Sequence, residues 1–210
     1  MASVITIAQQ KGGAGKTTLV AQLATALRAL GRAVALIDID PQASLTGWMR
    51  LREHTTPPPP DLRFSMVGGW RLGVEIDRLR REVDVVLVDT PPHAESEAKG
   101  AIRAADLVLV PCQPSPADLW ASQATLDLAT REKKEARMML NRVPPRAKGV
   151  EEARETIRKR GWPLLQAELG NRQSFVASFG RGLGVVESEP RSPAAEEVRA
   201  LIEELAREVG

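Results

Sequence analysis

The chain has 210 residues, of which 43% are hydrophobic and 27% charged, an ordinary composition for one globular α/β domain. Its formal net charge is only +2, so overall charge gives no argument for nucleic-acid binding. Any basic surface must come from local clustering of lysine and arginine. The single cysteine, Cys112, excludes an internal disulfide and is expected in the core, and no apolar run approaches the roughly 18 residues that a membrane span needs.

Apolar runs alternate with helical patterns, which predicts one α/β domain over residues 1–210, with a mostly parallel central sheet and helices on both faces. Strands are expected at residues 3–8, 33–38, 84–89, 106–111 and 135–141, with a weaker one at 162–166. Helices are expected at residues 16–30, 43–52, 71–82, 95–104, 117–131, 149–160 and 193–208. Residues 55–60 (TTPPPP) predict a polyproline-like spacer, either a surface connector or a peptide for a proline-binding domain.

The residues between the first strand and the first helix have the composition of a phosphate-binding loop. They are Lys11, Gly12, Gly13, Ala14, Gly15, Lys16, Thr17 and Thr18. Glycines let successive N–H groups point at one anion, and the helix that opens near Lys16 adds its positive dipole end. Lys16 can reach the β- and γ-phosphates, and the Thr17 hydroxyl can ligate Mg²⁺. The pattern G-x-x-x-x-G-K-[ST] asks for glycine where this chain has Gln10, and a second lysine, Lys11, stands at the mouth of the loop.

This loop, with its early lysine, resembles the deviant P-loop of the ParA/MinD family of partitioning and positioning ATPases. Further resemblances follow in the family's order: residues 35–42 (ALIDIDPQ) to its second strand, 85–92 (VVLVDTPP) to its Walker B strand and switch, 106–111 (DLVLVP) to the next strand, and 172–187 to the late segment of short ParA proteins. The resemblance implies a P-loop NTPase domain that binds ATP and Mg²⁺. Because the loop lies so near residue 1, it also implies the short type, without an N-terminal DNA-reading domain.

Phosphoryl transfer needs charge neutralisation, a metal and an oriented water. Asp89 ends an apolar strand where a Walker B carboxylate would hold Mg²⁺. By resemblance, Asp40 orients or activates the attacking water. Asp38 lies on the same strand face as Asp40 and is expected to support the metal or the loop. Helix N-capping ahead of Pro41 is the alternative for both residues.

Two further residues take their roles from the resemblance. It implies that Lys11 crosses the interface of an ATP-dependent homodimer and touches the partner's phosphates, so that it acts as a cation in trans. An exposed loop lysine is the alternative. Asn141 resembles the residue that contacts adenine, and a strand-ending turn is the alternative there.

The resemblance also implies non-specific DNA binding by the dimer, through arginines that contact phosphates. The candidates are Arg154, Arg158, Arg172 and Arg181. Arg154 and Arg158 are four residues apart and share a helix face, although nearby glutamates leave a solvated mixed-charge face as the alternative.

We therefore expect a cytoplasmic, nucleoid-associated ParA-type ATPase with weak hydrolysis, stimulated by a ParB-like or cargo-adaptor protein, that segregates a plasmid, a chromosome region or a protein cluster. A MinD-like membrane-cycling ATPase remains an alternative, but it needs a basic amphipathic C-terminal helix, and residues 194–209 are acidic. A P-loop biosynthetic synthetase is the other. His54 and His93 stand alone, so no zinc site is expected, and one cysteine does not suit an iron–sulfur reductase.

Overall fold

A six-stranded, fully parallel sheet, in the order β3-β2-β4-β1-β5-β6, forms the centre of the computed structural model, which describes residues 2–55, 62–92, 95–145 and 148–208. The strands are β1 (Ser3–Ile7), β2 (Val34–Asp38), β3 (Leu62–Met66), β4 (Val85–Asp89), β5 (Leu107–Cys112) and β6 (Glu135–Leu140). The helices are α1 (Lys16–Ala29), α2 (Ser44–Thr55), α3 (Leu72–Leu79), α4 (Glu95–Ala104), α5 (Pro116–Arg131), α6 (Lys148–Lys159), α7 (Gln173–Phe179), α8 (Val185–Ser188) and α9 (Pro193–Glu208), with one 3-10 turn, η1 (Gly69–Arg71).

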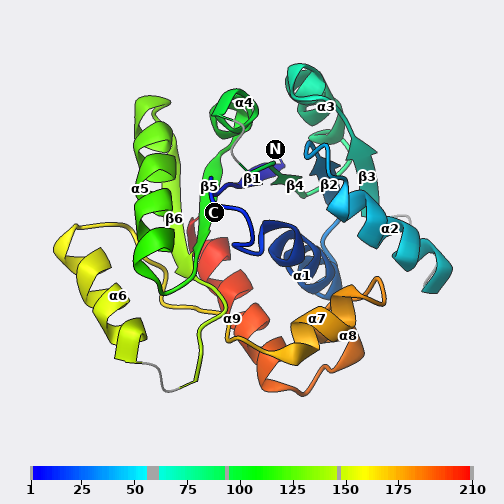
Figure 1. Cartoon of the computed structure of the whole chain (residues 1–210). Coiled ribbons are helices and arrows are strands. Elements are labelled where there is room, and N and C mark those ends of the chain that lie inside the picture. The colour runs from blue at the N-terminus through cyan, green and yellow to red at the C-terminus, as the bar shows by residue number, and fades with distance from the viewer. Residues whose placement is uncertain (1, 56–61, 93–94, 146–147, 209–210) are drawn as a thin grey trace.

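The two faces of the sheet bury different side chains, because neighbouring residues of a strand point to opposite faces. On one face, Ile5 and Leu36 pack in a core formed with α1 and α9. On the other, Val4 packs with α3 and α4, and Val108 packs with α5 and α6. Figure 1 shows α1 and α9 on one side of the sheet and α3, α4 and α5 on the other. The predicted fold class, one α/β P-loop domain with helices on both faces, is confirmed.

Five predicted strands are confirmed with their ends within one residue, but the weak strand at 162–166 is wrong. There Leu164 forms a single bridge to Met138. The bridge consists of Met138 N donating to Pro163 O and Leu165 N donating to Met138 O. Pro163 has no N–H to donate, so the pairing cannot extend from this bridge toward residue 162. β3 was not predicted. Among the described residues it pairs only with β2, at the edge of the sheet, and an edge strand tolerates the mixed polar and apolar composition seen here.

The seven predicted helices are confirmed, with ends shifted by at most three residues. The late segment contains two more, α7 and α8, which were not predicted. They have 7 and 4 residues and are too short for a clear helical period. Residues 56–60 of the predicted proline-rich spacer lie outside the part of the chain that the structure describes.

The carboxyl ends of the central strands meet at one edge of the sheet. Ile7 of β1 pairs in register with Asp89 of β4, and Asp38 of β2 pairs with Asp89 from the other side. The P-loop leaves β1 at this edge and enters α1 at Lys16. In open parallel sheets, ligands bind at this edge.

Candidate functional site

The P-loop is shaped by glycines with left-handed backbone conformations. Gly15 has a φ of +88° and is the N-cap of α1. A Cβ at Gly15 would lie 2.7 Å from Asn141 Nδ2, so both the φ angle and the available space require glycine. The loop curls round Ala14, whose carbonyl accepts a hydrogen bond of 2.8 Å from Asn141 Nδ2.

Asn141 therefore ties the end of β6 to the P-loop. Its side chain is buried, and its Oδ1 accepts a 2.9 Å hydrogen bond from Arg142 N. Both ends of the amide are engaged with the chain itself, as the strand-ending alternative expected. A contact with adenine stays a prediction.

Lys16 lies buried inside the loop. Its Nζ donates to Gln9 O at 3.1 Å, which holds the side chain along the loop's own backbone. Burial lowers the pKa of Lys16, while the negative charges of Asp89 and Asp40 act in the opposite direction. The ammonium thus lies within the field of both carboxylates.

Asp89 is the least satisfied polar group of the site. The residue is fully buried, and among the described residues neither carboxylate oxygen has a hydrogen-bond partner. Burial raises the pKa of Asp89 to about 7. The Thr17 hydroxyl and the charge of Lys16 lower this pKa, although the hydroxyl does not have the geometry of a full hydrogen bond. The charges of Asp38 and Asp40 raise it further. A buried carboxylate with two unused oxygens fits a hard cation such as Mg²⁺, which binds one or two protein carboxylates together with phosphates.

Asp38 differs from Asp89, although the two residues are neighbours in adjacent strands. Its Oδ1 accepts from Asp40 N at 3.0 Å, and its Oδ2 accepts from Thr46 N at 3.0 Å and from Thr46 Oγ1 at 2.9 Å. These contacts fasten the first turn of α2, so the structure favours the capping alternative for Asp38. Its role toward the metal stays a prediction.

Asp40 sits in the turn between β2 and α2 and is buried. Its Oδ1 accepts from Gln42 N at 2.9 Å, and its backbone carbonyl accepts from Ala43 N at 2.9 Å. Ala43 has a φ of +55°, a strained value for a residue other than glycine. The tight turn fixes Asp40 at the same edge as the P-loop, and its catalytic role stays a prediction.

Lys11 is bound by its own chain. Its Nζ lies 2.6 Å from Asp118 Oδ2 in the first turn of α5. Sequence reasoning missed Asp118, and the only signal for it was its place in the run Ser115-Pro116-Ala117-Asp118 that starts the helix. It also missed Gln9, whose Nε2 donates to Pro111 O and Ser122 Oγ and so joins the start of the loop to β5 and α5.

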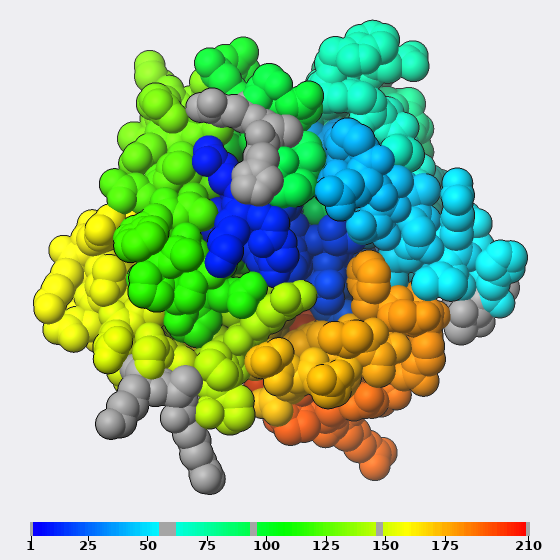
Figure 2. All heavy atoms as spheres, in the orientation of Figure 1, coloured from blue at the N-terminus to red at the C-terminus, as the bar shows by residue number. Residues whose placement is uncertain are grey.

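A cavity of about 230 Å³ opens beside the P-loop. Its lining comes from the loop and α1, from the end of β6 and from residues 169–176: Gly15, Thr18, Leu19, Gln22, Asn141, Arg142, Leu169, Gly170, Asn171, Arg172, Phe175 and Val176. Figure 2 shows the P-loop in blue at the middle of this face, with the orange α7 segment and the green and yellow-green segments around it. A cavity of this kind, next to a phosphate cradle, suits a nucleoside.

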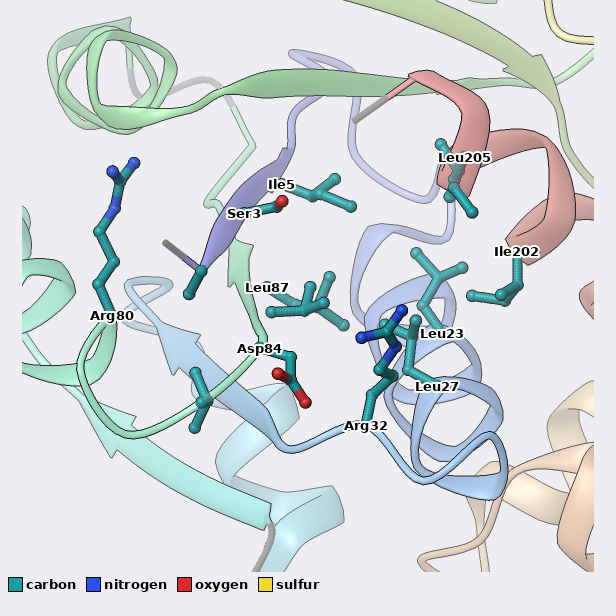
Figure 3. A pocket seen from close by; sticks show the side chains of 14 residues that line it. Ser3, Ile5, Leu23, Leu27, Arg32, Arg80, Asp84, Leu87, Ile202 and Leu205 are labelled. Carbon is teal, nitrogen blue, oxygen red and sulfur yellow. The ribbon is translucent and has the colours of Figure 1, made fainter. Parts of the chain in front are cut away.

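A second cavity, of about 480 Å³, lies at the opposite edge of the sheet. Figure 3 shows its apolar walls, formed by Leu23, Leu87 and Ile202, with Arg32 and Asp84 beside them. It lies at the amino ends of the strands, away from the P-loop.

The four predicted DNA-binding arginines fall on two separate parts of the molecule. Arg154 and Arg158 belong to α6, at the lower left of Figure 1, and Arg172 and Arg181 flank α7, at the lower right, with α9 between the two helices in this view. Arg154 is paired with Glu168 and Glu151, and Arg172 is paired with Glu197 at 2.5 Å. Arg172 also lines the cavity beside the P-loop, so it is a poor probe of DNA binding alone.

No helix among the described residues is long and apolar enough to cross a membrane. His54 lies in the last turn of α2, and His93 falls outside the described residues. Cys112 is buried in the core as predicted.

The glycine-shaped loop, the parallel sheet and the unsatisfied carboxylate at the end of β4 define a P-loop nucleotide-binding protein. The CbiA profile, described as the CobQ/CobB/MinD/ParA nucleotide binding domain, matches residues 5–185. The chain belongs to this family, and the resemblance to ParA/MinD proteins is confirmed.

Two relatives match almost the whole of this chain over almost the whole of their own lengths. A maintenance of carboxysome distribution protein A from Gloeobacter kilaueensis is 33% identical over 221 residues, which span 98% of this chain and 94% of the relative. The chromosome-partitioning ATPase Soj from Thermus thermophilus is 30% identical over 249 residues, which span 98% and 96%.

Solved structures show the same fold at low identity. The septum site-determining protein MinD from Pyrococcus horikoshii, complexed with Mg-ADP, has a TM-score of 0.84 at 21% identity and covers 100% of this chain and 98% of its own. An ATP complex of McdA from Cyanothece has a TM-score of 0.80 at 16% identity, with coverage of 96% and 94%. At these identities the likeness establishes the fold alone.

Proposed function

We propose that this protein is a ParA-type ATPase that binds ATP and Mg²⁺, dimerises when ATP is bound, binds DNA without sequence preference and positions a cargo. The observation that carries the proposal is Asp89, a buried carboxylate with no partner among the described residues, beside a P-loop that has an additional lysine. The relatives named for carboxysome distribution and chromosome partitioning, each matched over nearly its whole length, support a positioning function.

The loop amides and Lys16 hold the β- and γ-phosphates in this proposal, and the nucleoside occupies the cavity of about 230 Å³. Thr17 and Asp89 are the residues that hold Mg²⁺, with Asp38 supporting them through α2. When bound, Mg²⁺ neutralises charge on the transferring phosphate. Asp40 orients the attacking water, and Lys11 adds a cation from the partner subunit.

A protein that stimulates hydrolysis, ParB-like or a cargo adaptor, supplies cargo identity in this scheme. The MinD-like alternative requires a C-terminal helix free to lie on a membrane. The apolar side chains of α9, including Leu201 and Leu205, are buried in the core formed with α1. This packing argues against α9 itself as a membrane-binding helix.

Two substitutions test the chemistry. Lys16→Ala should abolish ATP binding, because it removes the buried cation of the phosphate cradle. Asp40→Ala should still bind ATP, because it leaves the phosphate cradle intact. It should nearly stop phosphate release, because it removes the group that orients the attacking water. Equilibrium nucleotide binding and a phosphate-release assay separate the two steps. An Asp40→Ala protein that hydrolyses ATP at the parental rate would contradict the assignment.

DNA binding should require ATP and fall steeply with salt, with a log–log slope of roughly 0.9 for each phosphate contacted. Arg158→Glu should weaken binding equally for two unrelated duplexes, as measured by fluorescence anisotropy at several salt concentrations. Arg131→Glu, the same charge change at the end of α5, is the matched control. Binding to anionic liposomes but to neither duplex, with every nucleotide, would favour the membrane-cycling alternative instead.

A further inference from the structure

Lys11, the additional lysine of the P-loop, is held in a contact within its own chain. Its Nζ donates to Asp118 Oδ2 at 2.6 Å, and Ser115 Oγ donates to the same oxygen at 2.5 Å. The Asp118 side chain is only 2% exposed, whereas that of Lys11 is 38% exposed. The second oxygen, Asp118 Oδ1, is buried and has no hydrogen-bond partner among the described residues. Lys11 is therefore the cation that compensates a buried carboxylate.

We propose that Asp118 is a positioning residue that holds Lys11 in cis and must release it before Lys11 can reach the nucleotide of a second copy of this chain. This inference rests on the proposed function, in which Lys11 acts in trans. An ammonium 2.6 Å from a carboxylate is largely neutralised, so from this position it attracts a distant phosphate only weakly. The trans contact and the Asp118 contact therefore compete for the same side chain.

Release of Lys11 has a cost because of where Asp118 lies. Without Lys11, the carboxylate keeps the Ser115 hydroxyl but loses its counter-ion, and an uncompensated buried charge is strongly unfavourable. Capping of α5 does not require this carboxylate, since Ser115 Oγ accepts from Asp118 N and Pro116 stands in the first turn. The Lys11 contact instead joins two segments 107 residues apart in the sequence. It holds the start of the P-loop against the first turn of α5.

A dimer contains two such contacts, and both must open. If each one disfavours the trans arrangement by at least about fivefold, the low end of typical coupling between sites, the dissociation constant of the dimer rises by about 25-fold. Removal of the charge at Asp118 should lower that constant by the same factor. The contact therefore raises the free energy that ATP binding must supply before two subunits associate.

The experiment measures the dimer dissociation constant by analytical ultracentrifugation with ATP and Mg²⁺ in an Asp40→Ala background, where hydrolysis does not deplete the nucleotide. Asp118→Asn should lower the constant by about 25-fold. Asp127→Asn, the same change at an exposed position of the same helix, should leave it unchanged. A constant that is unchanged or higher in Asp118→Asn overturns the proposal. If that variant does not fold, Asp118→Ser also removes the charge and carries the same expectation.

Lys11→Ala separates this inference from the proposed function. A Lys11→Ala protein that dimerises like the parent would refute the trans role itself. If Lys11→Ala stays monomeric while Asp118→Asn behaves like the parent, only the competition is refuted. Lys11→Ala with Asp118→Asn should dimerise no better than Lys11→Ala alone. A gain in that background would mean that Asp118 acts through some other group, and the proposal would fail. A purely structural role would shift the melting temperature without nucleotide and leave the dissociation constant unmoved.

Discussion

Replacement of Arg52 by methionine should destabilise the protein by about 3 kcal/mol, the low end of the usual cost of breaking a buried ion pair. The side chain of Glu187, the partner of Arg52, is 25% exposed and also lies 3.9 Å from Arg28. The Arg52 side chain is fully buried, and its two terminal nitrogens donate to Glu187 at 2.9 and 2.6 Å. It also donates to Gly182 O at 3.0 Å and lies 5.4 Å from the centre of the Trp48 ring. Methionine fills part of the space but supplies none of the donors.

The loss should be measured by urea unfolding and by the melting temperature, which should fall by about 6–12 °C at roughly 2–4 °C per kcal/mol. Arg50→Met, at an exposed position of the same helix, is the matched control and should change stability by less than about 0.5 kcal/mol. Arg52→Met combined with Glu187→Leu should recover much of the loss, because the Glu187 carboxylate is then no longer left without the Arg52 guanidinium.

The pH dependence supplies a second criterion. Despite the opposing effect of burial, Arg52 and the Gly184 N–H hold the pKa of Glu187 below its usual value. A carboxyl with a lowered folded pKa stabilises the protein above its unfolded pKa, and this stability is lost as the pH falls below about 4–5. Arg52→Met should show a weaker fall over that range. A loss below about 1 kcal/mol at neutral pH, or a double variant no more stable than the single one, would refute the reasoning.

Asp89→Asn should lose Mg²⁺-dependent ATP binding in calorimetry, yet gain about 2–4 kcal/mol of stability at pH 8 in chelator without nucleotide. The pKa of Asp89 is about 7 in the folded protein and 3.8 ordinarily, so the stability of the parent should fall as the pH rises from about 4 to 7. That fall should be absent in Asp89→Asn. A variant less stable than the parent at pH 8 would contradict this prediction. Gly15→Ala should cost about 1–3 kcal/mol in urea unfolding and weaken ATP binding, because of its φ and the Asn141 contact. Gly47→Ala, within α2 and with open space around it, should cost nothing, and equal effects of the two changes would argue against a special role for Gly15.

The fold could be predicted largely from the sequence because the central strands are buried on both faces and so consist of continuous apolar runs. β2 and β4 show this directly. β3 could not be predicted in this way because an edge strand buries less of its surface and tolerates polar residues such as Arg63. Residues 162–166 were misassigned for the opposite reason. Trp162 and Leu165 are apolar because they pack against core residues, while Pro163 prevents the pairing from extending toward residue 162.

The site could be predicted only in part. Glycine spacing predicts a P-loop because its residues are adjacent in sequence. In the structure, Lys16 lies within the electrostatic influence of Asp89 and Asp40. Contacts between distant segments carry no such local pattern. Asp118 lies 107 residues from Lys11, and Asn141 lies 127 residues from Ala14. Sequence reasoning gave Asn141 a ligand but not its own P-loop partner.

Asp38 and Asp89 illustrate how two residues with the same sequence signal receive different tasks. Each ends an apolar strand, and they pair in register. Thr46 reaches back from α2 to satisfy Asp38, whereas no described group bonds to Asp89. Hydrogen bonds within the chain offset the free-energy cost of burying the Asp38 carboxylate, whereas no described group does so for Asp89. A cation therefore gains most at Asp89, and its binding should stabilise the folded state by mass action. The instability at Asp89 is thus a source of affinity for a metal–nucleotide complex, while Asp38 keeps the adjoining turn in place.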